Sequence, residues 1–298
     1  MKLLILLSTW NGARYLPEQL TSILSQEYNC QLSVLIRDDG SQDDTRQIIE
    51  QMNDGRVEVL WGENLGAKGS YLALLAEAYR RKPDLIAFAD QDDLWLPGKL
   101  LRAADALSTV NGPALYCSAL NLVDEALRPI GTYSFSDLPS YEGSFFNNCA
   151  TGCTCVFNRA LLDLLAVLPE ADAIVMHDWW LYIVAAAFGQ VFYDQAPMIL
   201  YRQHASNQIG MQIGVGALFS RIRRLLRPPA KSSRLTQARE FDRIYYNRLT
   251  AGQAAYVAAL IKCEGHFMAR LKFAFTRRPK RTRLGDEIAA LFAFMLGR

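Results

Sequence analysis

Apolar runs of strand length alternate with helix-periodic segments along the first ninety residues of the chain. The runs that predict strands lie at residues 3–7, 32–36, 57–60 and 85–89. Segments with apolar residues on one helical face lie between them, at residues 14–26, 44–52 and 69–80. This alternation predicts an α/β fold built on a doubly wound, mainly parallel sheet.

The pattern is less regular beyond residue 110. Three more strands are predicted, at residues 114–117, 191–194 and 199–201. Helices are predicted at residues 157–168 and 177–188, and residues 121–124 and 142–148 are expected to be connecting segments. No internal repeat accompanies these elements.

Polar side chains follow three of the predicted strands directly. They are the segments Ser8 to Asn11, Asp38 to Ser41, and Asp90 to Asp93. In open parallel sheets, ligands bind beyond the carboxyl ends of the strands. Three polar clusters at that edge therefore indicate one shared ligand.

The segment Asp90-Gln-Asp-Asp93, called the acidic loop below, places three carboxylates within four residues. Their mutual repulsion raises the pKa of at least one of them unless a cation offsets it. Hard divalent cations take oxygen ligands, and Mg²⁺ uses one or two carboxylates together with substrate phosphates. The pattern favours a Mg²⁺ or Mn²⁺ site. The alternative is that Asp92 or Asp93 only caps a helix that begins near Pro97.

The segment Asp38-Asp-Gly-Ser41, called the DDGS turn below, carries two more carboxylates beside a glycine that permits a tight turn. These carboxylates can accept hydrogen bonds from a nucleotide base or ribose, or can simply form a turn and a helix cap. Neither G-x-G-x-x-G after the first strand nor a P-loop motif is present. Their absence argues against a dinucleotide-binding Rossmann enzyme and a P-loop NTPase.

Composition and charge divide the chain into two parts. Hydrophobic residues make up 51% of the 298 residues, and no apolar run has the ~20 residues of a membrane-spanning helix. Six cysteines without zinc spacing and no signal peptide predict reduced thiols in a cytoplasmic protein. Residues 1–209 have a net charge of −11, whereas residues 210–298 have a net charge of +13.

The basic part contains three segments that mix apolar and cationic residues, at 217–229, 267–280 and 288–296. Basic amphipathic helices bind anionic membrane surfaces, which predicts a peripheral membrane association. A core helix with a solvated basic face and a dimer contact are the alternatives. Nucleic acid is not expected as a partner, because no recognition motif surrounds these residues.

Taken in order, the motifs resemble those of glycosyltransferase family 2, which has the GT-A fold. The resemblance covers residues 3 to about 208, and it is closest to bacterial rhamnosyltransferases of polysaccharide and O-antigen assembly. The segments that carry it are STWNG at Ser8, LTSILSQ at Leu20, RDDGSQDDT at Arg37, NLG at Asn64, FADQDDLW at Phe88, NCATGCTCVF at Asn148, MHDWW at Met176, and YRQH at Tyr201 with Asn207.

The resemblance implies a role for each matching residue. Those implied to bind the nucleotide are Ser8, Thr9, Asn11, Asp38, Asp39, Asp90 and Gln91. Asp92 is implied as the metal ligand, with His204 near the metal or the diphosphate. Asp178 corresponds to the general base of inverting members, although an Asp at this position is also a common helix N-cap.

Five further residues are implied near the diphosphate or the acceptor: Asp93, Gly152, Trp179, Trp180 and Arg202. Arg202 can pair with phosphate oxygens or form an ordinary ion pair. One tryptophan can stack on a sugar, while at least one of the two is expected to be a buried core residue. His204 can equally be a structural hydrogen-bonding residue.

The resemblance implies an inverting, metal-dependent glycosyltransferase with a catalytic domain at residues 1–209 and a basic extension at residues 210–298. It would transfer a sugar such as L-rhamnose from a dTDP- or UDP-linked donor to a lipid-linked oligosaccharide at the inner face of the cytoplasmic membrane. One alternative is a nucleotidyltransferase that makes sugar nucleotides, which would need a basic, glycine-rich triphosphate loop. The other is a non-catalytic scaffold on the membrane that retains the fold.

Overall fold

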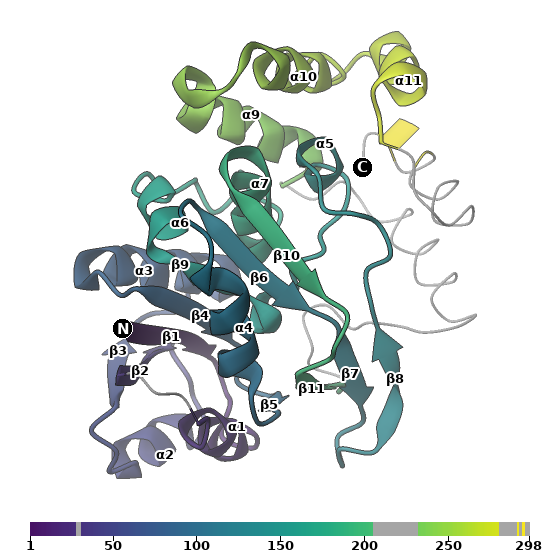
Figure 1. The fold of residues 1–298 in the computed structure, drawn as a ribbon. Coiled ribbons are helices and arrows are strands. Elements are labelled where there is room, and N and C mark those ends of the chain that lie inside the picture. Colours follow the sequence, from purple (N-terminus) through teal and green to yellow (C-terminus); the bar gives the residue numbers. More distant parts are fainter. Residues whose placement is uncertain (28–30, 205–231, 280–290, 292–293, 296–298) are drawn as a thin grey trace. The chain divides into compact units, whose positions relative to one another are not determined.

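The computed structural model describes residues 1–27, 31–204, 232–279, 291 and 294–295 (Figure 1). These residues form two compact units. The first contains the described parts of Met1–Phe135, Cys149–Leu168 and Phe188–Gly210. The second contains the described parts of Ser136–Asn148, Pro169–Ala187 and Met211–Arg298.

A seven-stranded sheet forms the centre of the first unit. In spatial order its strands are β10 (Gln190–Asp194), β6 (Ala114–Ser118), β9 (Val156–Asn158), β4 (Leu85–Ala89), β1 (Lys2–Thr9), β2 (Gln31–Asp38) and β3 (Val57–Trp61). Neighbouring strands are parallel except for β9, which is antiparallel to both β4 and β6. The predicted α/β fold with a mainly parallel sheet is confirmed.

Burial on both faces of the sheet explains the unbroken apolar runs of its central strands. Residues 3–7 of β1 are at most 3% exposed, and all of β4 is buried. Leu3 of β1 lies in register with Leu32 of β2 and with Leu85 of β4, so the polar residues that follow these strands reach one edge together. The helices of this unit are α1 (Leu16–Leu24), α2 (Thr45–Gln51), α3 (Gly66–Arg81), α4 (Lys99–Ser108) and α6 (Arg159–Leu164).

A second sheet brings the last strand of the unit to the acidic loop. Its order is β5 (Leu94–Trp95), β11 (Ile199–Arg202), β7 (Leu120–Val123) and β8 (Pro129–Tyr133). Because β5 follows the acidic loop directly and pairs with β11, residues 90–93 lie beside the end of β11. The prediction that residues 121–124 form a connecting segment is wrong, since most of them belong to β7.

The segment predicted as a helix at residues 157–168 is partly a strand. β9 occupies Val156–Asn158 and follows the short 3₁₀ helix η1 (Gly152–Thr154). α6 begins only at Arg159, where the Asn158 side chain accepts a hydrogen bond from the Leu161 backbone N–H at 3.1 Å. A strand of three residues, two of them buried, has no period of its own beside an apolar helix, which is why the pattern merged the two elements.

The second unit is helical. Its elements are α5 (Tyr141–Ser144), α7 (His177–Phe188), α9 (Arg234–Tyr245), the 3₁₀ helix η2 (Tyr246–Arg248), α10 (Ala251–Ile261) and α11 (Phe267–Thr276). α7 ends at the boundary with the first unit, and α5 lies in a segment that was expected to be a connection. Capping boxes begin α9 at Ser233 and α10 at Thr250. Aromatic rings of Tyr141, Phe145, Phe241 and Tyr256 pack against one another in its core.

The basic segments of the sequence fall differently on this unit. The predicted segment at residues 217–229 lies outside the described residues, as does most of 288–296. The segment at residues 267–280 contains α11, which is helical as expected. Among the described helices, none is both long enough and apolar enough to cross a lipid bilayer.

Candidate active site

The DDGS turn and the end of β1 form one tightly hydrogen-bonded corner. The Asp39 backbone N–H donates to Thr9 O at 2.8 Å, and the Asp38 carboxylate accepts from the Ser41 N–H at 3.0 Å. Asn11 joins the same corner, because its Oδ1 accepts from the Gln42 N–H at 2.8 Å. Gly40 has a φ of +80°, a backbone conformation that side chains other than glycine rarely adopt.

Asp39 is buried at the base of this corner and is oriented by a cation. It is 2% exposed, and its Oδ1 accepts hydrogen bonds from the Arg37 guanidinium and from the Leu65 N–H. Arg37 also donates to Ser70 Oγ at 3.1 Å, and Ser70 Oγ lies 2.6 Å from Ser8 Oγ. The structure therefore brings the predicted nucleotide-binding residues of β1 and β2 together.

The acidic loop is tied to the same edge through its side chains. Gln91 Oε1 accepts from Thr9 Oγ1 at 2.7 Å and from the Trp10 N–H at 2.8 Å. The Tyr71 hydroxyl of α3 donates to Asp90 Oδ1 at 3.0 Å, and Gln19 of α1 donates to the Asp90 carbonyl at 2.9 Å. These contacts fix the orientation of the acidic loop relative to the corner formed by the DDGS turn and the end of β1.

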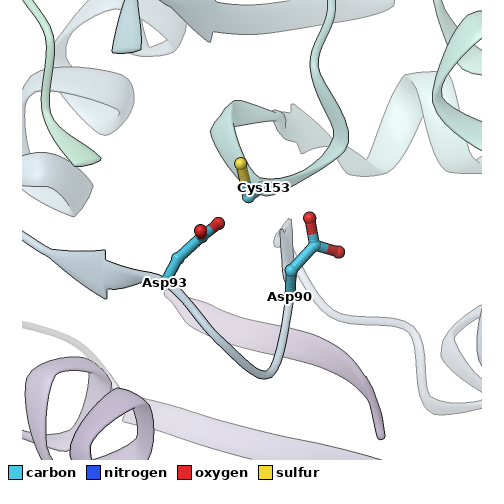
Figure 2. Close-up of side chains that lie close together, drawn as sticks. All are labelled: Asp90, Asp93 and Cys153. Atoms are coloured by element: carbon cyan, nitrogen blue, oxygen red, sulfur yellow. The ribbon is translucent and has the colours of Figure 1, made fainter. Parts of the chain in front are cut away.

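Two carboxylates of the acidic loop and a thiol of η1 converge (Figure 2). Ligand atoms of Asp90, Asp93 and Cys153 all lie within 4.8 Å of one another. Burial, together with the negative charge of Asp92, raises the pKa of Asp90 to about 7. Burial and the charges of Asp92 and Asp90 raise the pKa of Asp93 well above its usual value.

Asp92 and His204 make a second pair of ligand atoms at this edge. His204 Nε2 lies 2.8 Å from Asp92 Oδ2. Asp93 Oδ2 is buried and has no hydrogen-bond partner in the described part of the chain. A hard divalent cation such as Mg²⁺ or Mn²⁺ suits this edge. It would offset the repulsion between the carboxylates and could take carboxylate oxygens and an imidazole nitrogen as ligands.

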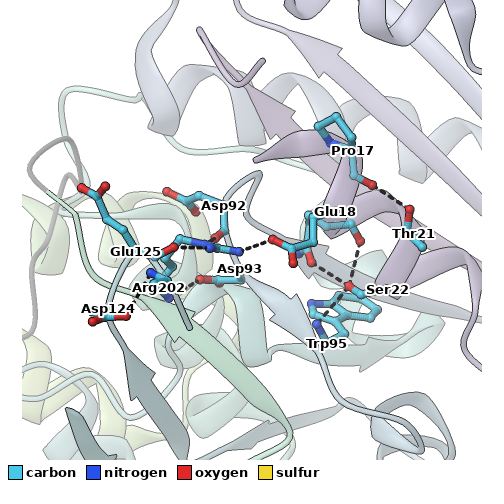
Figure 3. A network of polar contacts seen from close by, with 12 residues as sticks. Pro17, Glu18, Thr21, Ser22, Asp92, Asp93, Trp95, Asp124, Glu125 and Arg202 are labelled. Atoms are coloured by element: carbon cyan, nitrogen blue, oxygen red, sulfur yellow. Dashed lines mark hydrogen bonds and ion pairs between the residues drawn. The ribbon is translucent and has the colours of Figure 1, made fainter. Parts of the chain in front are cut away.

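Arg202 is hydrogen-bonded to protein groups on several sides (Figure 3). Its residue is 3% exposed, and Nε donates to the Asp92 carbonyl at 2.9 Å. Nη1 donates to the Glu125 carbonyl at 2.7 Å, and Nη2 donates to Glu18 at 2.5 Å. The Arg202 backbone N–H donates to Asp93 Oδ1 at 3.2 Å. In this arrangement Arg202 holds the acidic loop against α1 and β11.

Lys99 adds a buried cation to the same region. It is fully buried, and Nζ lies 3.7 Å from the ring centroid of Trp95. Nζ forms no hydrogen bond with any residue that the structure describes. Burial lowers the pKa of Lys99 to about 8, while the negative charge of Asp93 acts in the opposite direction.

The predicted general base lies in the second unit, in the first turn of α7. Asp178 is 8% exposed, and its carboxylate accepts a hydrogen bond from the Trp179 N–H at 2.5 Å. The Trp179 indole N–H donates to the Ser144 carbonyl at 2.6 Å. Trp180 is fully buried against Phe241, as expected for at least one of the two tryptophans. Gly152, in contrast, belongs to η1 of the first unit.

The sequence model of glycosyl transferase family 2 matches residues 4–163, more than half of the chain. The chain belongs to that family. It is therefore a glycosyltransferase that uses nucleotide sugars and has the GT-A fold.

Two characterised proteins illustrate its similarity to bacterial sugar transferases. It is 31% identical over 230 residues to the dTDP-rhamnosyl transferase RfbG of Shigella flexneri, covering 72% of this chain and 78% of RfbG. It is 28% identical over 161 residues to the UDP-Glc:alpha-D-GlcNAc-diphosphoundecaprenol beta-1,3-glucosyltransferase WfgD of Escherichia coli, covering 53% of this chain and 61% of WfgD.

Solved structures confirm the fold. The chain aligns with S. aureus TarS 1–349 in complex with UDP-GlcNAc at a TM-score of 0.61 and 17% identity, covering 99% of this chain and 80% of TarS 1–349. It aligns with the mannosyltransferase PcManGT of Pyrobaculum calidifontis, in complex with GDP-Man and Mn²⁺, at a TM-score of 0.52 and 17% identity. That alignment covers 99% of this chain and 84% of PcManGT.

Some residues at the edge of this family 2 enzyme had no sequence signal of a functional position. Tyr71 and Gln19 lie on helices, where their spacing only indicated a buried face. The sequence predicted only that Cys153 is a reduced thiol, yet it lies beside Asp90 and Asp93. Each reaches the acidic loop from a segment distant in sequence, so only the packed sheet reveals it.

Proposed function

We propose that this enzyme transfers L-rhamnose, with inversion, from a dTDP-linked donor to a hydroxyl of a lipid-linked oligosaccharide. The observation that carries the proposal is the junction of the DDGS turn with the acidic loop, made through Thr9, Gln91 and Asp39. The names of two relatives supply the finer points: dTDP-rhamnose from RfbG and a diphosphoundecaprenol-linked acceptor from WfgD. UDP-linked sugars are the competing donor class.

We assign to the residues the roles that the family resemblance implies. Ser8, Thr9, Asn11, Asp38 and Asp39 bind the nucleotide, together with Asp90 and Gln91 of the acidic loop. Asp92 and His204 would hold Mg²⁺ or Mn²⁺, and Asp93 would lie near the diphosphate. When bound, the cation offsets the charge that develops on the leaving diphosphate.

Asp178 accepts the proton in the transfer step. The acceptor oxygen attacks the anomeric carbon, and the new carbon–oxygen bond forms as the bond from that carbon to the diphosphate oxygen breaks. The hydroxyl proton passes to the Asp178 carboxylate, and the nucleoside diphosphate leaves with the bonding electron pair. A carboxylate suffices as base, because the hydroxyl becomes acidic only as it attacks.

Membrane association completes the proposal. α11 exposes three apolar side chains: Phe267 is 60% exposed, Met268 71% and Phe275 74%. Residues 265–285 include seven Lys and Arg and no Asp or Glu. Apolar side chains among cations favour an anionic lipid surface. The lipid-linked acceptor would therefore meet the enzyme at the inner face of the cytoplasmic membrane.

A thermal-shift screen of nucleoside diphosphates tests the donor class. We expect dTDP to raise the melting temperature with Mn²⁺ present, and to raise it little without the metal, because binding to the native state alone stabilises it. UDP and GDP serve as comparisons under the same conditions. A shift that is equal with and without Mn²⁺ would contradict the metal-dependent site, and a shift with UDP alone would assign a different donor.

Replacing the proposed base tests the chemical step. Asp178→Asn should retain the donor-induced thermal shift but lower transfer by about 10²–10⁴-fold, the usual contribution of general-base catalysis. Transfer is measured as radiolabelled sugar incorporated from the donor into lipid-linked glycans of isolated membranes. Asp172→Asn changes an exposed carboxylate six residues earlier and should leave transfer intact. Normal turnover by Asp178→Asn would remove Asp178 from the role of base.

A further inference from the structure

Tyr15, the residue before α1, lies against two groups of the acidic site. Its ring stacks on the His204 imidazole, with ring centroids 5.0 Å apart and planes 28° apart. The guanidinium carbon of Arg202 lies 4.7 Å from the centroid of the same ring. His204 and Arg202 come from the end of β11, whereas Tyr15 follows β1. At the proposed metal site, the Tyr15 ring therefore links the segment that follows β1 to the segment at the end of β11.

The backbone of Tyr15 is fixed independently of these contacts. The backbone N–H groups of Tyr15 and Leu16 donate to the Gly12 carbonyl at 3.1 and 3.0 Å. The Gly12 N–H in turn donates to Thr45 Oγ1 at 2.8 Å. Pro17 restricts the first turn of α1. The tyrosine ring is thus presented from a rigid position.

His204 lies two residues beyond the end of β11, and the Tyr15 ring packs on it there. Its side chain is 6% exposed, and Nε2 lies 2.8 Å from Asp92 Oδ2. A stacked ring limits rotation of the imidazole and keeps Nε2 directed at the carboxylate. Arg202 supports the other partner of the pair, because it donates to the Asp92 carbonyl.

The hydroxyl of Tyr15 contributes nothing to this support. Its oxygen is buried and has no hydrogen-bond partner among residues 1–27, 31–204 and 232–279. The aromatic ring alone makes the contacts to His204 and Arg202. Phenylalanine can therefore replace tyrosine at this position, whereas an aliphatic side chain cannot reproduce the stack.

We propose that Tyr15 is a positioning residue for the metal site, whose ring holds His204 in the orientation that directs Nε2 at Asp92. This inference rests on the proposed metal-dependent function. Groups that orient a metal ligand typically change metal affinity by about 10–100-fold when they are removed. Tyr15 contacts the proposed ligand His204 directly, so its effect should appear in the free enzyme.

Mn²⁺ binding to the full chain without any donor tests the proposal. The dissociation constant is measured by electron paramagnetic resonance of free Mn²⁺. Tyr15→Leu should weaken binding by about 10-fold or more, and Tyr15→Phe should stay within about 3-fold of wild type. Tyr79→Leu, which removes an exposed tyrosine that contacts Arg159, is the matched control and should not change Mn²⁺ binding.

A double-mutant cycle shows whether Tyr15 acts through His204. In a His204→Ala background, Tyr15→Leu should cause no further loss of Mn²⁺ affinity. Full additivity of the two losses would overturn the proposal, and so would an equal loss in Tyr15→Phe and Tyr15→Leu. Thermal melting checks that the variants fold, and Tyr15→Met replaces Tyr15→Leu if the latter is unfolded.

The outcomes separate this inference from the proposed function. If wild-type protein binds no Mn²⁺, the metal-dependent function fails and takes the inference with it. If wild type binds Mn²⁺ and Tyr15→Leu binds it equally well, the inference alone fails.

Discussion

Buried titratable side chains of the two units change the stability of this enzyme with pH in opposite directions. Burial lowers the pKa of His177 to about 3, so the folded chain keeps this imidazole neutral where the unfolded chain protonates it. Burial raises the pKa of Asp90 to about 7, so the folded chain takes up this proton before the unfolded chain does. Acidification below pH 7 therefore destabilises the fold through His177 and stabilises it through Asp90.

The contribution of His177 can be isolated by substitution. Above pH 6.5 both states hold a neutral imidazole, and below it the unfolded state binds the extra proton. The free energy of unfolding should therefore fall by about 1.4 kcal/mol between pH 7.5 and pH 5.5 through this residue. His177→Gln removes that part of the pH dependence. The measurement is urea denaturation of both proteins at the two pH values.

Asp90 and the other carboxylates are present in both the wild type and His177→Gln. Their contribution therefore cancels when the free energies of unfolding of the two proteins are subtracted. Gln cannot be protonated, so its curve should lose less stability at pH 5.5 than the wild-type curve. Identical pH dependence in the two proteins would show that His177 is protonated in the folded state, against the effect of its burial.

At the scale of elements, α11 differs from the other described helices of its unit in what it exposes. Met268, Lys272 and Phe275 are exposed and lie one or two turns apart, so they form a single stripe. Phe273 and Ala274 of the same helix are buried. The helix thus packs one side into the unit and presents apolar groups around a cation on the other.

This stripe leads to a prediction about lipid binding. The double substitution Met268→Ser and Phe275→Ser should weaken binding to vesicles that contain phosphatidylglycerol by about 10-fold, because two exposed apolar side chains that would insert into the lipid surface are lost. Vesicle sedimentation measures the effect. Leu138→Ser, at a residue 90% exposed in the same unit, is the control and should bind like wild type.

Salt and lipid charge give an independent check of this prediction. Binding of the wild-type chain should be weak on neutral phosphatidylcholine vesicles and should decrease as ionic strength rises, since surface electrostatics are screened. Binding that ignores lipid charge would contradict an anionic surface as the partner of α11.

At the scale of the whole molecule, hydrophobic periodicity predicted the elements whose burial shows in the local sequence pattern. The strands at residues 3–7 and 85–89 are apolar throughout because the sheet is covered on both faces. The polar residues that follow residue 89 predicted the acidic loop. β9 could not be predicted, since Val156–Asn158 is short and merges with the apolar residues of α6. Cys153, Tyr71 and Tyr15 were missed because their relation to the site arises from tertiary packing alone.

The position of β9 also bears on how the newly made chain must behave. β4 and β6 do not pair with each other, so Val156–Asn158 supplies the hydrogen bonds that join β6 to the strands made before it. The parallel partner of β6, β10, is synthesised later still. A ribosome that has passed residue 118 but not residue 156 therefore carries one unpaired edge of β4 and both unpaired edges of β6. Unpaired strand edges are the state in which nascent chains aggregate or recruit chaperones.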